Sequence, residues 1–281
     1  MNGGATRWVV SGTQVDLDGG AIVGVLNVTP DSFSDGGAFV EPDEAIAHGL
    51  RMFDSGAVLV DVGGESTRPG AGPVPEDEEL RRLLPTVAGL VGAGVPVSVD
   101  TYKPGVARRA LAEGARAIND VTGFRDEEMV EVVASSSCGV VAMHMRGTPA
   151  DMHLDPAYTD VVAEVESELL ASAQRLAEAG VSHDRIVLDP GIGFGKRAPH
   201  SLQLLANLDG LAAHGYPIMI GTSRKGFLGR LIQSESTERR DMATAVTTAL
   251  AFSRGARLFR VHDVPRSRDA LSVAAAIVAN Q

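Results

Sequence analysis

Eight short apolar runs in the sequence are each followed directly by side chains that can bind a ligand. Their order along the chain is Asn27, Asp61, Asp100-Thr101, Asn119-Asp120, Met143-His144, Asp189, Ser223-Arg224-Lys225 and Arg260-Val261-His262-Asp263. Carboxylates and amides bind the N–H and amino edges of a planar heterocycle, because they offer directional acceptors and donors. Basic side chains neutralise a phosphate or a carboxylate. The set therefore predicts a site for a nitrogen heterocycle that carries an anionic group.

The two halves of this chemistry fall on different residue types. The candidates for the heterocycle edge are Asp100, Asn119 and Asp189. The candidates for the anion are Arg68, Lys225, Arg260 and His262. A helix is predicted soon after His262-Asp263, and a helix N-terminus favours a bound anion.

The apolar runs themselves are predicted strands. They cover residues 21–26, 57–62, 95–99, 115–119, 139–143, 185–188, 217–220 and 256–261. Because they are continuous apolar segments without every-other-residue alternation, they fit parallel strands that are covered on both faces. Helical spacing predicts helices between them, including 43–55, 76–92, 104–113, 159–179, 201–214, 239–253 and 266–278.

Strict alternation of strands and helices predicts an α/β protein with a parallel sheet. Eight repeats predict a single closed (β/α)8 TIM barrel, in which the polar strand ends converge on one face. The alternative is an open doubly wound sheet. We expect one domain over 1–281, with the barrel at 21–281 and a short N-terminal β-hairpin at 7–18 that could close its bottom.

Composition limits the kinds of partner. The formal net charge is −11 and the pI is about 5.1, which argues against a nucleic-acid surface because phosphate backbones need clustered basic residues. No uncharged apolar stretch is long enough for a membrane span, and the first residues lack a signal-peptide pattern. The one cysteine, Cys138, is expected to be buried. A cytoplasmic protein is the expectation, without nucleic-acid or membrane partners.

The motifs at the strand ends resemble those of the dihydropteroate synthases, a pterin-binding enzyme family. NVTPDSFSDGG at 27–37 and DVGGESTRPG at 61–70 resemble the two signature loops of the family. The other motifs follow in family order: VDTYK at 99–103, NDV at 119–121, MHMRGTP at 143–149, DPGIGFGK at 189–196, SRK at 223–225 and RVHD at 260–263. The match runs from about residue 20 to the C-terminus. Eight motifs in order at barrel spacing make the resemblance specific.

The resemblance implies a role for each matching residue. The pterin ring would be held by Asp100, Asn119, Asp189 and Lys225, with Met143 nearby and Arg260 against its face. The diphosphate would be held by Asn27, Thr67, Arg260 and His262, with Asn27 also near a bound Mg²⁺. The aminobenzoate site would be formed by Phe33, Arg68, Pro69, Phe194, Ser223 and Lys225.

The resemblance also implies the reaction. The family condenses (7,8-dihydropterin-6-yl)methyl diphosphate with 4-aminobenzoate, giving 7,8-dihydropteroate and diphosphate in folate biosynthesis. It is a family of Mg²⁺-dependent transferases, usually homodimers, and a target of sulfonamides. The residues expected to act in catalysis are Lys225, Asp100, Arg260, Phe33, Asp35 and Arg68. We hypothesise a dissociative substitution, with Asp35 or the diphosphate as acceptor of the amine proton.

Three other functions remain open from the sequence. A pterin-barrel methyltransferase would share the pterin-anchoring residues but has no need for Thr67, Arg260 and His262. A Schiff-base aldolase would need Lys225 to be desolvated beside a carbonyl substrate. A catalytically silent pterin-binding paralogue would have no need for Phe33 and Arg68.

Overall fold

The computed structural model describes residues 6–29, 42–66, 70–152, 154 and 156–280. Eight parallel strands form one sheet in the order β8-β7-β6-β5-β4-β3-β10-β9. They are β3 Ala21–Asn27, β4 Ala57–Gly63, β5 Val97–Asp100, β6 Ala117–Asp120, β7 Gly139–Met143, β8 Ile186–Asp189, β9 Met219–Ile220 and β10 Leu258–Val261. A parallel bridge between Leu188 and Ile218 joins the two ends of the sheet. The predicted barrel is confirmed, and the open sheet was wrong.

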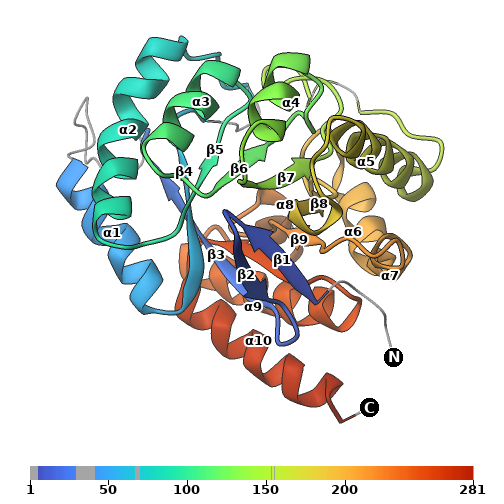
Figure 1. Cartoon of the computed structure of the whole chain (residues 1–281). Coiled ribbons are helices and arrows are strands. Elements are labelled where there is room, and N and C mark those ends of the chain that lie inside the picture. The colour runs from blue at the N-terminus through green and yellow to red at the C-terminus, as the bar shows by residue number, and fades with distance from the viewer. Residues whose placement is uncertain (1–5, 30–41, 67–69, 153, 155, 281) are drawn as a thin grey trace.

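Helices surround the barrel (Figure 1). They are α1 Pro42–Asp54, α2 Glu76–Gly92, α3 Pro104–Ala112, α4 Glu127–Ala134, α5 Val161–Glu178, α6 Ala198–Ala206, α7 Leu208–Ala212, α8 Gly226–Leu231, α9 Thr237–Ser253 and α10 Val264–Val278. The helix predicted at 201–214 is instead two helices, because Asn207 leaves helical geometry with φ −125°. Among the described helices, none is long and apolar enough to cross a membrane.

Four strands, β5, β6, β9 and β10, begin two residues later than predicted. For all of them except β9 the reason is the same. The predicted starts Val95, Ala115 and Ala256 are buried. Each follows a glycine with positive φ, and each backbone N–H binds a carbonyl in the last turn of the preceding helix. This is the pairing that ends a helix in a left-handed glycine. These residues are therefore helix caps that happen to be apolar, and the sheet ladder starts after them.

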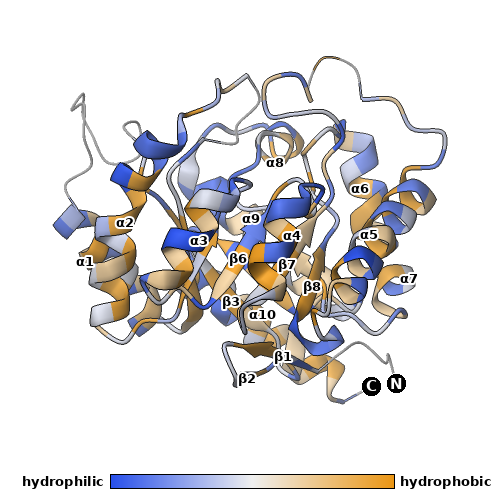
Figure 2. Ribbon diagram, turned by 45° about the horizontal axis from the view of Figure 1, so that its top comes forward, coloured by the Kyte–Doolittle hydropathy of each residue, from blue (hydrophilic) through white to orange (hydrophobic). Residues whose placement is uncertain are grey.

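The bottom of the barrel is filled by an apolar layer. Alternate residues of the strands point inward, and the layer contains Ala21, Val23, Leu59, Ala117, Val141, Val187, Met219 and Leu258. The hairpin of β1 Arg7–Val10 and β2 Thr13–Asp16 lies across this end of the barrel (Figures 1 and 2). Trp8 packs into the layer, and its Nε1 donates to the carbonyl of Arg185 at 2.8 Å. The prediction that the hairpin closes the bottom is confirmed.

Replacing Trp8 with alanine should destabilise the barrel without touching its other end. Trp8 is 1% exposed, and deletion of a fully buried aromatic side chain costs ~3–5 kcal/mol. We expect a loss of this size in the free energy of unfolding, measured by circular dichroism in urea. Thr13→Ala, an exposed change in the same hairpin, is the control. A loss below ~1 kcal/mol for Trp8→Ala would show that the hairpin is dispensable.

Candidate active site

The next inward layer of the barrel is charged and polar. A residue two places after an inward residue also points inward. Leu59 is thus followed by Asp61, Ala117 by Asn119, Val187 by Asp189, and Leu258 by Arg260. The alternation that builds the apolar bottom therefore also places the strand-end polar residues above it, toward the carboxyl ends of the strands.

Arg260 is the centre of this layer. Its Nε donates to Asp61 Oδ2 at 2.6 Å, and its Nη2 donates to Asp100 Oδ2 at 2.7 Å. Asp61 Oδ2 also accepts from Asn119 Nδ2 at 3.2 Å. Asp61 is 1% exposed, so it is a buried acid that orients two predicted ligand-binding side chains. Its place at a strand end made Asp61 a candidate from the sequence, but its contacts with Arg260 and Asn119 were not predicted.

Asp100 and Asn119 each present an acceptor that the protein does not use. Asp100 Oδ1 and Asn119 Oδ1 are buried and have no hydrogen-bond partner among the described residues. Burial raises the pKa of Asp100 to about 7, with Arg260 opposing the shift and the negative charge of Asp61 adding to it. Because a buried acceptor without a donor is costly, this pair is suited to N–H donors of a ligand.

Asp189 and Lys225 form a second acid–base pair, on segments of the chain other than the strands of Asp100 and Asn119. Asp189 Oδ1 accepts from the backbone N–H of Gly191 at 2.7 Å. Lys225 donates to the carbonyl of Ile192, and its Nζ lies 4.3 Å from the centre of the Phe194 ring. Burial lowers the pKa of Lys225 to about 7, against the opposing charge of Asp189. Burial raises the pKa of Asp189, against the charge of Lys225.

Gly221 shows that Arg260 and Asp189 lie close together. A Cβ atom built on it would lie 3.9 Å from Arg260 Cβ and 4.0 Å from Asp189 Oδ2. A Cβ atom on Gly63 would likewise lie 3.7 Å from Asn27 Oδ1 and 3.8 Å from Asp100 Oδ2. Asn27 and Asp100, like Asp189 and Arg260, therefore lie close together at the carboxyl ends of the strands, where barrels place their active sites.

Ser223 and His262 stand together at the end of β10. Ser223 Oγ lies 2.9 Å from His262 Nδ1 and accepts from the backbone N–H of His262 at 3.1 Å. Asp263 then caps α10 by accepting from the backbone N–H of Arg266 at 3.0 Å. The imidazole is thus held beside a helix N-terminus, which favours an anion.

Comparison with known proteins identifies the family to which this chain belongs. The model of the family described as pterin binding enzyme matches residues 23–262. Dihydropteroate synthase of Mycobacterium leprae is 48% identical over 262 residues, covering 91% of this chain and 92% of the relative. The chain belongs to the dihydropteroate synthase family.

Solved dihydropteroate synthases share the whole fold. The enzyme of Xanthomonas albilineans with 4-aminobenzoic acid has a TM-score of 0.91 at 45% identity, covering 98% of this chain and 99% of that chain. The enzyme of Burkholderia cenocepacia complexed with 7,8-dihydropteroate has a TM-score of 0.87 at 42% identity, with 98% of both chains covered.

The structure brings together those predicted dihydropteroate synthase site residues that it describes. They are Asn27, Asp100, Asn119, Met143, Asp189, Phe194, Ser223, Lys225, Arg260 and His262. Met143 belongs to a small apolar cluster with Val121, Met145 and Met152, against which Phe194 packs. Five predicted residues, Phe33, Asp35, Thr67, Arg68 and Pro69, lie outside the described residues.

A buried ion cluster braces the start of the connection after β4. Lys103 donates to the carboxylates of Glu65 and Glu79, and the hydroxyl of Tyr102 donates to Glu65 Oε1 at 2.8 Å. Glu79 is only 1% exposed. Burial raises its pKa, and the hydrogen bond from Lys103 opposes that shift. Lys103 and its partners Glu65 and Glu79 are far apart along the chain, so their contact was not predicted from the sequence.

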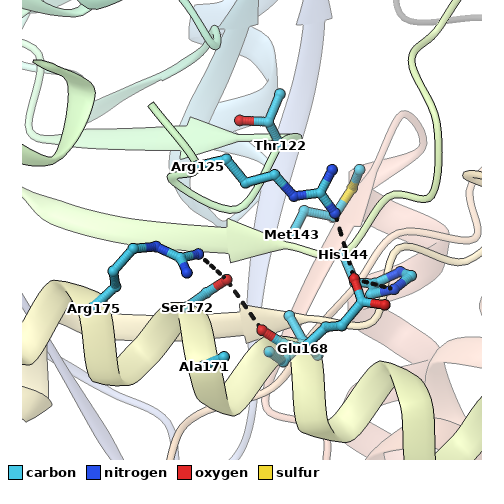
Figure 3. Close-up of a pocket in the computed structure, with 9 residues that line it drawn as sticks. Thr122, Arg125, Met143, His144, Glu168, Ala171, Ser172 and Arg175 are labelled. Atoms are coloured by element: carbon cyan, nitrogen blue, oxygen red, sulfur yellow. Dashed lines mark hydrogen bonds and ion pairs between the residues drawn. The ribbon is translucent and has the colours of Figure 1, made fainter. Parts of the chain in front are cut away.

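A cavity of about 270 Å³ lies behind β7, against α5, and shares Met143 with this site (Figure 3). Arg175 on its wall donates to Phe124 O at 3.1 Å and to Ser172 Oγ at 3.0 Å. Glu168 lies between Arg125, at 3.5 Å, and His144, at 3.3 Å. Because these charged groups already have protein partners, the cavity is a weaker candidate for the substrate than the barrel mouth.

Neutralising Asp61 should lower the pKa of Asp100. The Asp61 carboxylate repels the charged form of Asp100 and competes with it for Arg260. Asp61→Asn removes both the repulsion and the competition for Arg260. We therefore expect the carboxyl group of Asp100 to titrate below about 7. Carbon-13 NMR of the carboxyl groups measures this. Asp16→Asn, in the exposed hairpin, is the control, and an unchanged Asp100 titration would contradict the coupling.

Proposed function

We propose that the chain condenses (7,8-dihydropterin-6-yl)methyl diphosphate with 4-aminobenzoate, giving 7,8-dihydropteroate and diphosphate, a transferase reaction of folate biosynthesis. The observation that carries the proposal is the set of unpaired acceptors on Asp100 and Asn119 beside the buried cation Arg260 at the barrel mouth. Relatives solved with 4-aminobenzoic acid and with 7,8-dihydropteroate support both ends of the reaction.

The buried acidic and amide side chains at the mouth bind the pterin. Asp100 Oδ1 and Asn119 Oδ1 accept from its N–H groups, and Asp189 accepts from its amino edge. Asp61 and Asp100 hold the Arg260 guanidinium by its edge, which leaves a planar face for stacking on the ring. Met143 supplies an apolar contact, and Lys225 donates to the ring.

The basic side chains at the mouth hold the diphosphate. Arg260 and His262 provide donors, and the N-terminus of α10 adds its positive dipole end. Asn27 borders the same opening, and Thr67 completes the set as predicted from the motif. Such preorganised donors stabilise the negative charge that develops on a leaving group.

Mg²⁺ fits this donor set as a metal shared with the substrate. The described residues contain no group of three or more His, Cys, Asp and Glu side chains that could hold a metal ion. Asn27 offers an amide oxygen at the mouth, and Mg²⁺ is commonly held by one or two protein oxygens together with substrate phosphates and water. When bound, the metal would neutralise charge on the diphosphate.

The proposed chemistry is a dissociative substitution. The C–O bond between the pterin methylene and the diphosphate breaks, and the electron-rich pterin delocalises the resulting positive charge. The carboxylates of Asp100 and Asp189 favour that charge. The neutral amine of 4-aminobenzoate then forms the C–N bond and releases a proton to the diphosphate or to Asp35. Phe194, Ser223 and Lys225 border the aminobenzoate, together with Phe33, Arg68 and Pro69, which are assigned from the motifs alone.

Incubation with the pterin diphosphate and labelled 4-aminobenzoate tests the reaction directly. We expect labelled dihydropteroate, and its formation should stop when EDTA removes Mg²⁺. In Asp189→Ala the affinity for the pterin diphosphate should fall about 10- to 100-fold by calorimetry, since hydrogen bonds to a charged group contribute ~1.5–3 kcal/mol. Asp54→Ala, at the exposed end of α1, is the control. Without labelled product from the unaltered chain, the proposed function is rejected.

The protein is proposed to work as a homodimer in the cytoplasm. Met242, Val246 and Leu250 of α9 are 56%, 51% and 61% exposed, and their spacing places them on one helix face. On α10, Val273 and Ile277 are similarly exposed. Adjacent exposed apolar stripes mark an interaction surface, and a second copy is the partner we propose. The buried free thiol of Cys138 fits a reducing compartment.

Leu250→Asp should convert the dimer to a monomer. A charge on each copy would be buried against its counterpart in a symmetric interface, so we expect the mass from sedimentation equilibrium to halve. Leu202→Asp, on α6 and 41% exposed, is the matched control and should stay dimeric. A monomeric unaltered chain, or a dimeric Leu250→Asp, would show that this surface does not join two copies.

A further inference from the structure

Lys196 is a buried lysine whose three N–H groups all find acceptors. Its Nζ lies 2.7 Å from His144 Nδ1, 3.3 Å from the carbonyl of His144 and 3.1 Å from the carbonyl of Phe194. An ammonium group has three donors and no acceptor, so these contacts match it completely. Lys196 is 8% exposed. Burial lowers its pKa, and the negative charge of Asp189 opposes that shift.

His144 is built to accept from this lysine. Burial, together with the charge of Lys196, lowers the pKa of His144 to about 2, so the ring is neutral at physiological pH. With Nδ1 accepting, the ring proton lies on Nε2, which is 3.3 Å from Glu168 Oε2 (Figure 3). Nε2 makes no hydrogen bond within the described residues, so the hydrogen-bonded line runs from His144 through Lys196 to Phe194.

These contacts fasten the loop after β8 to the end of β7. At Gly191, a Cβ atom would lie 1.9 Å from the carbonyl oxygen of His144, and at Gly195 it would lie 2.3 Å from that of Arg146. Both glycines have positive φ, so the loop follows a path that ordinary side chains would block. Directly after the second close approach, Lys196 supplies the polar attachment.

Phe194 is the part of this loop that faces the barrel mouth. Its ring lies 4.3 Å from Lys225 Nζ and packs against the cluster that contains Met143, Met145 and Met152. Its backbone is held at both ends, since its N–H donates to the carbonyl of Gly191 at 3.0 Å and its carbonyl accepts from Lys196. Any shift of the Lys196 attachment would therefore move the aromatic wall and the surroundings of the Lys225 amine.

We propose that Lys196 is a positioning residue for the second substrate: held by His144, it fixes Phe194 as the wall against which 4-aminobenzoate binds. The proposal rests on the proposed function, because Lys196 would act on the second substrate through its hydrogen bond to the carbonyl of Phe194. A lysine that only stabilised the fold would lower stability when replaced, but it would not change the binding of one substrate more than that of the other.

The chain offers a matched control for that distinction. Arg185 is another buried cation that donates to main-chain carbonyls, to Cys138 O at 2.7 Å and Val133 O at 2.8 Å. It lies at the opposite end of the barrel, where its own carbonyl accepts from Trp8. Arg185→Met should therefore remove a comparable internal attachment without changing the mouth.

The test compares Lys196→Met, Lys196→Gln and Arg185→Met in the full chain. For Lys196→Met we expect the KM for 4-aminobenzoate to rise about tenfold or more relative to the KM for the pterin diphosphate, as loss of charged hydrogen bonds predicts. Lys196→Gln retains amide donors and should show a smaller rise in the same direction. If Lys196→Met does not fold, the comparison of KM values is made with Lys196→Gln alone. Arg185→Met should lower the melting temperature and leave the ratio of the two KM values unchanged.

Hydrogen exchange provides a readout that does not need activity. Amides of residues 191–196 should exchange faster in both Lys196 variants than in the unaltered chain, while those of Arg185→Met should not. An unchanged KM ratio in both Lys196 variants would overturn the proposal, even with faster exchange, because the lysine would then be structural only. If the unaltered chain forms no product, the proposed function fails instead, and unchanged exchange would separately reject the attachment by Lys196.

Discussion

The pairing of Arg260 with two carboxylates inside the barrel is the interaction on which the site depends. A buried guanidinium without partners is strongly destabilising, and Asp61 and Asp100 remove that penalty from two different strands. This arrangement uses only one oxygen of each acid for Arg260. The unpaired Oδ1 of Asp100, beside the unpaired Oδ1 of Asn119, is thus a consequence of stabilising the arginine, and it is also the acceptor that a heterocycle would need.

The same burial explains how an acidic protein can bind an anionic substrate. The net charge of −11 repels anions at long range. Inside the mouth, however, interactions are less screened than at the surface, so a few cations outweigh the distant field. Lys225 illustrates the balance: burial lowers its pKa to about 7, and a nearby anion would raise it again. Its positive charge is therefore most stable when an anionic group occupies the site.

The sequence predicted those parts of the fold and site that depend on local order. Strands and helices alternate along the chain, and polar residues such as Asp189 and Arg260 stand at strand ends, so both could be read without coordinates. Two short helices, α4 and α8, were not predicted. Asp126, which caps α4 by accepting from the backbone N–H of Glu128 at 2.8 Å, was an available signal. The split at Asn207 and the helix caps at Val95, Ala115 and Ala256 depend on backbone geometry that apolar spacing does not report.

Contacts between distant segments were the part that sequence could not give. Lys103, which is half-buried, and Lys196, which is buried, both brace connections at the mouth, yet they do so with different partners. Lys103 is paired with the carboxylates of Glu65 and Glu79, so its charge is neutralised where it stands. The direct acceptors of Lys196 are a neutral ring and two carbonyls, and the negative charge that most opposes the lowering of its pKa is that of Asp189. The loop that carries Phe194 is therefore coupled electrostatically to Asp189 of the site, and the Lys103 brace is coupled to Asp100 through the charge of Glu79.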